Sequence, residues 1–154
     1  MQKKIINSVD DFVALNGQVL GISRWIEISQ ELIDNFADAT FDHQWIHTNL
    51  ERARNESPFN TTVAHGYFTL SLLPTLLEDT LEVNNLDYLV NYSIHNMVYK
   101  NAVLSGSRIR LVATLCYAKD LGKICKTEIK CCFEIEGQDI PALEGSVVYL
   151  FYFK

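Results

Sequence analysis

The sequence predicts an α+β fold in which a long central helix is buried and wrapped by a curved antiparallel sheet. Residues 57–77 contain no Asp, Glu, Lys or Arg, and apolar side chains fall on every face of a helix built over residues 65–79. A helix that is apolar all round must be covered by other atoms. Its uninterrupted apolar runs are much shorter than the roughly 20 residues of a membrane span, so we expect protein to cover it and no membrane to be involved.

The covering sheet is predicted from the C-terminal half of the chain. From Tyr88 onward, long segments are rich in Val, Ile, Thr, Tyr, Phe and Cys, and short polar turns separate them. Long strands joined by short loops pair in the antiparallel sense. Alternating apolar and polar side chains indicate that one face is partly solvated. The predicted strands cover residues 88–99, 107–118, 123–135 and 143–153.

Size and composition fit one domain over residues 1–154, because a chain of about 150 residues can bury a substantial core. The formal net charge is −6 and Lys and Arg do not cluster, which argues against a nucleic-acid partner. The N-terminal segment has no secretion-signal pattern, so we expect a cytoplasmic protein. The cysteines lack CxxC spacing, and we expect reduced thiols. They are Cys116, Cys125, Cys131 and Cys132.

Three further elements are predicted in the N-terminal part. Ser8 is a candidate N-cap for a short helix over residues 9–16. Apolar residues with a period of two predict a first strand near residues 20–28. Ser29 is a candidate N-cap for a helix over residues 30–39. The face of this helix that we expect to be buried consists of Leu32, Phe36 and Ala39.

The polar segment that follows has two interpretations. If it were helical, His43 and His47 would share a face and form part of a metal site, but the spacing identifies no third ligand. The capping-box pattern of residues 48–51, with Thr48 as the N-cap, instead predicts a helix over residues 49–54 and a loop ahead of it that includes His47. In a loop, Asp42 and His47 can converge. We favour the loop.

The start of the central helix is predicted to matter more than its body. His65 and Gly66 open the helix with little side-chain bulk, which leaves the N–H groups of the first turn available to an outside acceptor. We expect the His65 ring to help close this helix start. Pro74 removes the N–H that would bond residue 70, so we expect a kink there.

Several of these segments together resemble one known family. The sequences DHQWIH at 42–47 and VAHGY at 63–67 resemble the paired hydratase motifs of the MaoC-like family, which includes (R)-specific enoyl-CoA hydratases, and are most similar to its nodulation-protein-N-like branch. The similarity continues through residues 69–74, 91–92 and 106–108. It implies a hot-dog fold, usually as a homodimer with an acyl-thioester site between the subunits.

The resemblance implies roles for individual residues. The catalytic Asp and His of the family fall on Asp42 and His47, as base and acid with the division between them open, and the oxyanion-hole glycine falls on Gly66. A carboxylate beside an imidazole can share one water, and a fixed N–H can stabilise the enolate that forms. Taken singly, an Asx-turn, a satisfied loop histidine and tight packing would also explain these three. The expected substrate-binding residues are Gln44, His65, Tyr67 and Ser71, although core packing explains Tyr67 and Ser71 equally well.

The implied reaction is reversible hydration of trans-2-enoyl-CoA, or of the corresponding acyl-carrier-protein thioester, to the (R)-3-hydroxyacyl form. No metal or redox cofactor is required for it. The alternatives are a hot-dog thioesterase and a non-catalytic module that binds acyl thioesters. The chain departs from the family at two places. Gln44-Trp45 replaces the common Asn-Pro pair, and Pro74 stands where some relatives carry a serine.

Overall fold

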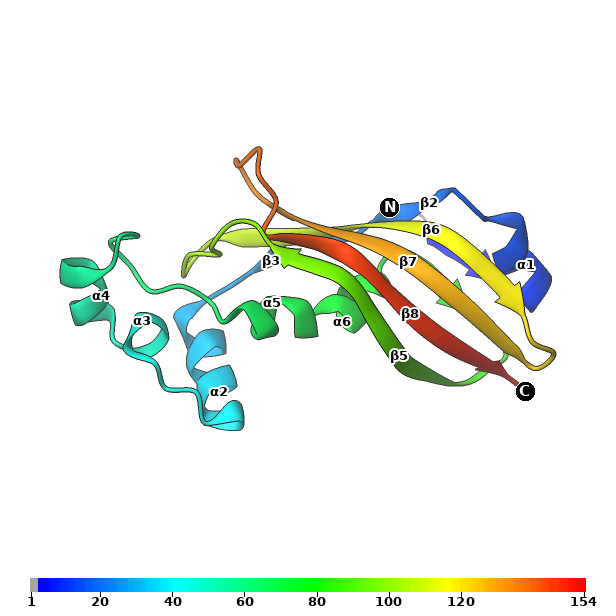
Figure 1. The fold of residues 1–154 in the computed structure, drawn as a ribbon, viewed down its shortest axis with the longest axis horizontal. Helices are drawn as coiled ribbons and strands as arrows, with labels where there is room; N and C mark the ends of the chain where they lie inside the picture. Colours follow the sequence, from blue (N-terminus) through cyan, green and yellow to red (C-terminus); the bar gives the residue numbers. More distant parts are fainter. Residues whose placement is uncertain (1–2) are drawn as a thin grey trace.

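The computed structural model describes residues 3–154 and has the predicted α+β architecture (Figure 1). Its main sheet is six-stranded, in the order β2-β6-β7-β8-β5, with β3 also pairing with β6, and every pairing is antiparallel. The long strands agree with the predictions to within about two residues. The strands of this sheet are β2 (Val19–Ile22), β3 (Ile26–Glu27), β5 (Leu86–Tyr99), β6 (Arg108–Asp120), β7 (Ile124–Ile135) and β8 (Leu143–Phe153).

The strand predicted over residues 20–28 is interrupted. Ser23 lies between β2 and β3, where its hydroxyl donates to the Arg24 carbonyl at 2.8 Å and accepts from the Leu111 N–H at 2.9 Å. These side-chain hydrogen bonds compete with the regular ladder. A second, two-stranded parallel sheet, which the sequence did not predict, pairs β1 (Lys4–Ile6) with β4 (Leu81–Val83).

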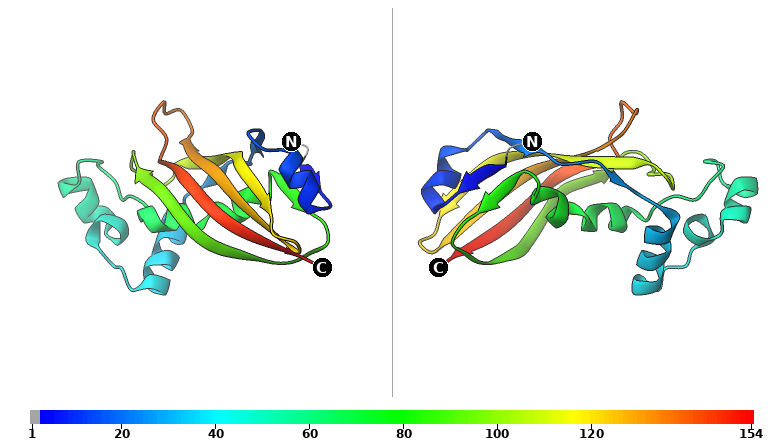
Figure 2. Two further views of the ribbon diagram at one scale, coloured as in Figure 1. Left: turned by 45° about the vertical axis from the view of Figure 1, so that its right-hand side comes forward. Right: turned by 180° about the vertical axis from the view of Figure 1, so that it is seen from behind.

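The central segment lies along one face of the main sheet in all the ribbon views (Figures 1 and 2). It consists of two short helices, α5 (Gly66–Ser71) and α6 (Leu73–Leu77), and not of the single long helix predicted. The helix is interrupted at Leu72, which is both the C-cap of α5 and the N-cap of α6. Pro74 lies in the first turn of α6, where its missing N–H costs no intrahelical hydrogen bond. The kink predicted at Pro74 therefore takes the form of an end of one helix and the start of another.

The core lies between this segment and the sheet. Along β6, alternate residues from Ile109 to Leu115 are fully buried, while the residues between them are partly exposed. One face of the sheet is thus apolar, and the other is half solvated. From the central segment, Phe68, Leu73, Leu76 and Leu77 complete the core. No helix within residues 3–154 has both the length and the apolar character that a membrane span needs.

Edge strand β5 is irregular. Its register against β8 shifts at three places, and the last shift lies between His95 and Val98. Asn96, within this bulge, has a left-handed φ of 50°. Opposite it, a Cβ on Gly145 would lie 2.7 Å from the Met97 Cα, so only glycine permits this close approach of the two backbones.

The remaining helices lie in the N-terminal half, and α2, α3 and α4 extend beyond one end of the sheet (Figure 1). The predicted caps of the first two are confirmed: Ser8 accepts from Asp11 N and Ser29 accepts from Leu32 N, each at 3.3 Å. The cap of α4 is Asn49, which accepts from Arg52 N at 2.9 Å, so the predicted cap at Thr48 is wrong. The four helices are α1 (Val9–Ala14), α2 (Gln30–Thr40), α3 (Trp45–Thr48) and α4 (Leu50–Glu56).

The buried face of α2 differs from the prediction. Ile33 and Ala37 are fully buried, whereas Leu32 is 39% exposed and Ala39 is exposed. Phe36 is half-buried and packs on Phe68 of α5, with ring centroids 5.2 Å apart. The orientation of α2 is thus set by its contact with the central segment, which its own periodicity does not encode.

Candidate active site

Asp42 and His47 converge in the structure, as the motif predicts. Asp42 lies in the loop that follows Phe41, the left-handed C-cap of α2, and His47 lies within the short helix α3. The prediction of a loop through His47 is therefore wrong, but only residues 45–48 are helical, so the divergence expected of a continuous helix does not arise. One side-chain atom from each of Asp42, His47 and His65 lies within 4.8 Å of the other two.

The orientation of His47 is fixed by hydrogen bonds. Its Nδ1 lies 2.7 Å from the Val63 carbonyl oxygen, and because a carbonyl only accepts, Nδ1 carries the proton and Nε2 keeps a free lone pair. Its backbone carbonyl accepts from Gln30 Nε2 at 2.8 Å. Gln30 also bonds the Thr62 hydroxyl. No sequence pattern pointed to Gln30, which is an ordinary helix-start residue until the fold places it beside His47.

The environment of His47 favours its neutral form. Burial is the largest cause and lowers the pKa of His47 below its ordinary value of 6.5. The nearby His65 also lowers this pKa, while the hydrogen bond to Val63 and the charge of Asp42 oppose the shift. A neutral imidazole with a free Nε2 can accept a proton at neutral pH.

His65 contacts both of these residues. It is only 4% exposed, and its Nε2 lies 2.9 Å from the Asp42 backbone oxygen and 3.9 Å from Asp42 Oδ2. Its ring stacks on that of His47 with centroids 3.7 Å apart and planes 25° apart. His65 is also the N-cap of α5, but its side chain makes no capping hydrogen bond. The expectation that its ring closes the helix start is therefore wrong.

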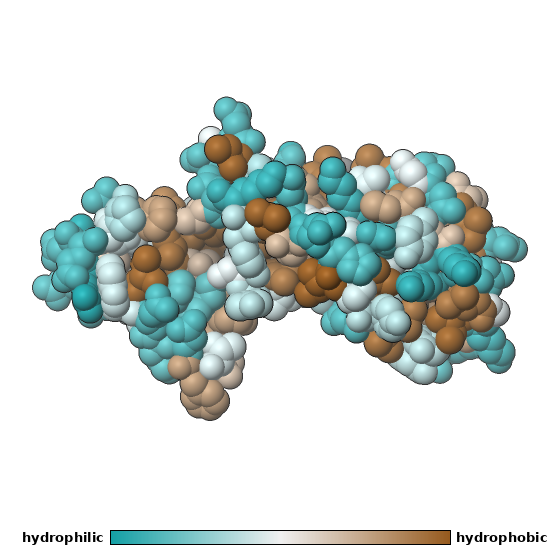
Figure 3. Space-filling view, in the orientation of Figure 1, coloured by the Kyte–Doolittle hydropathy of each residue, from teal (hydrophilic) through white to brown (hydrophobic). Residues whose placement is uncertain are grey.

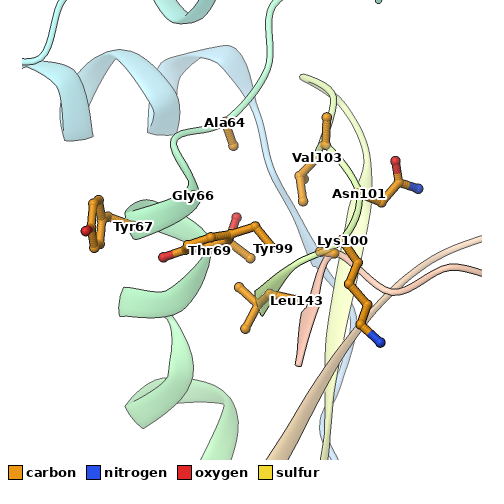
Figure 4. Close-up of a pocket in the computed structure, with 11 residues that line it drawn as sticks. Ala64, Gly66, Tyr67, Thr69, Tyr99, Lys100, Asn101, Val103 and Leu143 are labelled. Atoms are coloured by element: carbon orange, nitrogen blue, oxygen red, sulfur yellow. The ribbon is translucent and has the colours of Figure 1, made fainter. Parts of the chain in front are cut away.

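Gly66 opens α5 beside a pocket of about 470 Å³ (Figure 4). A Cβ on Gly66 would lie 2.8 Å from Tyr99 Cε1, so a side chain there would push into the tyrosine ring. Tyr67 is 75% exposed at the rim of the pocket and meets Tyr99 edge-on, with ring centroids 6.3 Å apart. The other lining residues are Ala64, Thr69, Lys100, Asn101, Ala102, Val103, Ala142 and Leu143.

The other predicted residues are more dispersed. Gln44 is exposed next to Asp42, and its backbone N–H lies 3.4 Å from Asp42 Oδ1, the weak Asx-turn that the sequence allowed. Ser71 lines a second pocket of about 510 Å³ between α5, α6 and strands β5 and β8, and its hydroxyl donates to the Phe68 carbonyl. Neither pocket is lined by Asp42 or His47. The pair connects to the Gly66 pocket through His65, the residue preceding Gly66.

A metal ion would find few free ligand atoms in this cluster. His43 is not part of it, so the site with His43 and His47 as ligands is not formed. The His43 Nε2 lies instead 3.8 Å from Asp38 Oδ1. His65 is the third group that spacing failed to identify. However, His47 Nδ1 is engaged by a carbonyl and His65 Nε2 by another. The Asp42 carboxylate and His47 Nε2 remain, and the other unengaged nitrogen of the cluster, His65 Nδ1, is buried. Two accessible ligand atoms suit a shared water better than a metal.

Comparison with known proteins shows the family to which the chain belongs. Residues 11–131 match the family model described as MaoC like domain, and the chain belongs to that family. The (R)-hydratase from A. caviae involved in PHA biosynthesis has a similar fold. It aligns with a TM-score of 0.71 at 17% identity, over 87% of this chain and 94% of that one. The hot-dog fold implied by the sequence motifs is thereby confirmed.

Particular relatives are closer in sequence. The 3-hydroxyacyl-thioester dehydratase Z of Mycobacterium tuberculosis (strain ATCC 25618 / H37Rv) is 39% identical over 140 residues, which cover 90% of this chain and 92% of that protein. Nodulation protein N of Rhizobium leguminosarum bv. viciae is 37% identical over 156 residues, covering 95% and 92%. Both agree with the resemblance found in the motifs.

The lowered pKa of His47 gives a direct prediction. NMR titration of the imidazole signals should place the midpoint of His47 below 6.5, and the His47→Asn variant identifies its signal. As the pH falls through 6.5, the unfolded chain takes up this proton before the folded protein does, so the free energy of unfolding decreases. A midpoint at or above 6.5 would contradict the assigned environment.

Proposed function

We propose that this protein is an (R)-specific hydratase and dehydratase that adds water reversibly to 2-enoyl thioesters to give 3-hydroxyacyl thioesters. The observation that carries the proposal is the convergence of Asp42 and His47 on one small space, with Gly66 linked to them through His65. Membership of the MaoC-like family and a relative named as a 3-hydroxyacyl-thioester dehydratase support it.

The proton transfers follow from the tautomer of His47. A ligand atom of Asp42 and one of His47 lie within 4.8 Å of each other, which leaves room for one shared water. We assign the two protons of this water to the Asp42 carboxylate and to the unprotonated Nε2 of His47. The water oxygen attacks C3 of the enoyl thioester, and its proton passes to Nε2. The imidazolium then gives a proton to C2, so the imidazole is regenerated and the net change is addition of water. The Asp42 charge stabilises the transient imidazolium.

The N–H of Gly66 supplies the remaining requirement. When water adds to C3, negative charge develops on the thioester oxygen, and a fixed N–H donor aimed at that oxygen stabilises it. The first N–H groups of a helix have no partner within the helix. Gly66 stands at this position of α5 and faces the 470 Å³ pocket. We assign the Gly66 N–H to the oxyanion, and Tyr67 and Tyr99 to the walls that receive the thioester.

The assay with crotonyl-CoA tests the reaction. The wild-type protein should consume the enoyl absorbance and yield the (R)-3-hydroxy product on chiral analysis. Asp42→Asn should lower kcat by about 10²- to 10³-fold, the range expected when one preorganised electrostatic contact to the transition state is lost. Asp38→Asn is the matched control, because Asp38 is an exposed carboxylate of α2 and should have no effect. Undiminished turnover by Asp42→Asn refutes the assignment, release of free thiol indicates a thioesterase, and binding without turnover indicates a binding module.

Gly66 gives a steric prediction. In Gly66→Ala the new methyl group meets the Tyr99 ring, which must shift into the pocket, so kcat/KM for crotonyl-CoA should fall at least about tenfold. The same substitution in a Tyr99→Ala background should cost much less relative to Tyr99→Ala alone. Equal losses in the two backgrounds would show that the tyrosine contact is not the cause.

We further propose that the protein is a homodimer formed through β5. This strand is the edge of the main sheet, and an exposed edge can pair with another chain. Several large apolar side chains on it are more than half exposed. Figure 3 shows hydrophobic residues exposed among polar ones on the face of the molecule that it draws. Tyr67 and Tyr99 are exposed at the Gly66 pocket. The apolar residues of β5 that are more than half exposed are Tyr88, Tyr92, Ile94 and Val98.

Analytical ultracentrifugation tests this assembly. The wild-type protein should sediment with twice the 17.6 kDa mass of the chain. Ile94→Lys places a charge on the β5 edge and should shift the equilibrium toward the monomer. Leu121→Lys, a similarly exposed position outside β5, should leave the dimer intact. A monomeric wild-type protein would contradict the proposal.

The cytoplasm is the compartment we propose for this enzyme. All four cysteines, at positions 116, 125, 131 and 132, are free. Burial raises the pKa of the Cys125 and Cys131 thiols to about 12, which keeps them protonated and unreactive. Free thiols of this kind are typical of a reducing environment.

A further inference from the structure

His65 is buried in a way that packing alone does not explain. Its ring is 4% exposed and lies between the rings of Phe36, with centroids 5.1 Å apart, and His47, with centroids 3.7 Å apart. Nε2 donates its only hydrogen bond to the Asp42 backbone oxygen. Among residues 3–154, no group lies within hydrogen-bonding distance of the buried Nδ1. A phenylalanine would fill this space without burying an unpaired nitrogen, so the imidazole is costly for stability.

The loop that carries Asp42 needs an external support. The Asp42 side chain is 50% exposed, and Phe41 before it has a left-handed φ of 61°. Within the loop, the carboxylate is offered only the Gln44 N–H, at the long distance of 3.4 Å. Without the hydrogen bond from His65, this Asx-turn would be the main local restraint on the carboxylate, and it would turn Asp42 toward its own loop.

The same ring also limits His47. The Val63 carbonyl holds Nδ1 but allows the imidazole to swing about that bond, and a face stacked 3.7 Å away removes this freedom. His65 is followed directly by Gly66. One residue is therefore joined to the carboxylate loop by a hydrogen bond, to the imidazole by stacking, and to the oxyanion-hole residue by a peptide bond.

We propose that His65 is a positioning residue that holds Asp42 and His47 toward the same water beside the Gly66 N–H. The proposal rests on the proposed hydration reaction for its catalytic consequence. The two contacts have separate roles: the Nε2–H fixes the carboxylate loop and the ring face fixes His47. His65 contacts neither water nor substrate in this scheme.

Two substitutions separate these contacts. His65→Phe keeps the stacking face and loses the donor, whereas His65→Gln keeps an N–H donor near Nε2 and loses the stack. With crotonyl-CoA, His65→Phe should lower kcat by about 10- to 100-fold and change KM by less than about threefold, since a small displacement of a catalytic group has effects of this size. His65→Gln should recover part of kcat. His43→Phe is the matched control, because His43 is exposed on the same loop and should leave kcat unchanged.

Thermal unfolding distinguishes positioning from stability. Since the imidazole is costly to bury, His65→Phe should unfold at the same temperature as the wild type or higher, while turning over more slowly. Wild-type kcat in His65→Phe would overturn the proposal. A kcat loss in His65→Phe and His65→Gln that merely follows the loss of folded protein would overturn it too.

A titration tests the positioning without any turnover. The Asp42 charge raises the pKa of His47, so Asp42→Asn should lower the NMR midpoint of His47 in the wild-type background. In the His65→Phe background Asp42 is no longer held, and the same substitution should shift the midpoint much less. Equal shifts in both backgrounds would overturn the proposal. If the wild type fails to hydrate enoyl thioesters, the proposed function fails, yet this cycle still decides whether His65 positions the pair.

Discussion

The burial of α5 and α6 against the sheet is the constraint on which the rest of the structure depends. Phe68, Leu73, Leu76 and Leu77 are each at most 7% exposed, and a fully buried side chain of this size contributes about 1.5–3 kcal/mol. Because this segment is fixed along its length, its first residue, Gly66, is fixed at the end of the sheet. The pocket and the cluster of Asp42, His47 and His65 form around that point.

Asp42 and His47 are brought there by contacts that extend from this segment. Phe36 of α2 packs on Phe68 and on His65, which ties α2 to the start of α5. Gln30, at the first turn of α2, then holds the His47 carbonyl. Asp42 lies in the loop after α2 and His47 lies in α3, and none of residues 41–48 is fully buried. The positions of Asp42 and His47, the proposed catalytic pair, thus depend on a few aromatic and polar contacts.

The sequence predicted the elements whose signals are local or long. The four long strands, two of the three predicted caps, and the meeting of Asp42 with His47 were found from pattern and motif. Helix α3, the pairing of β1 with β4, and the buried face of α2 were not, because elements of three or four residues carry no periodicity and because packing partners set a helix's orientation. His65 was noticed, but its contacts with Asp42 and His47 span 23 and 18 positions and needed the fold.

The irregular register of β5 has a consequence for how this family can vary in length. At each of the three shifts, the spacing along β5 differs from that along β8, so the ladder already tolerates unequal residue counts. The gain or loss of one residue in β5 can be absorbed at such a point without reversing the inward and outward alternation beyond it. Tyr99 at the far end would keep its place beside Gly66, so the length of this edge strand can change without displacing the pocket that the two residues line.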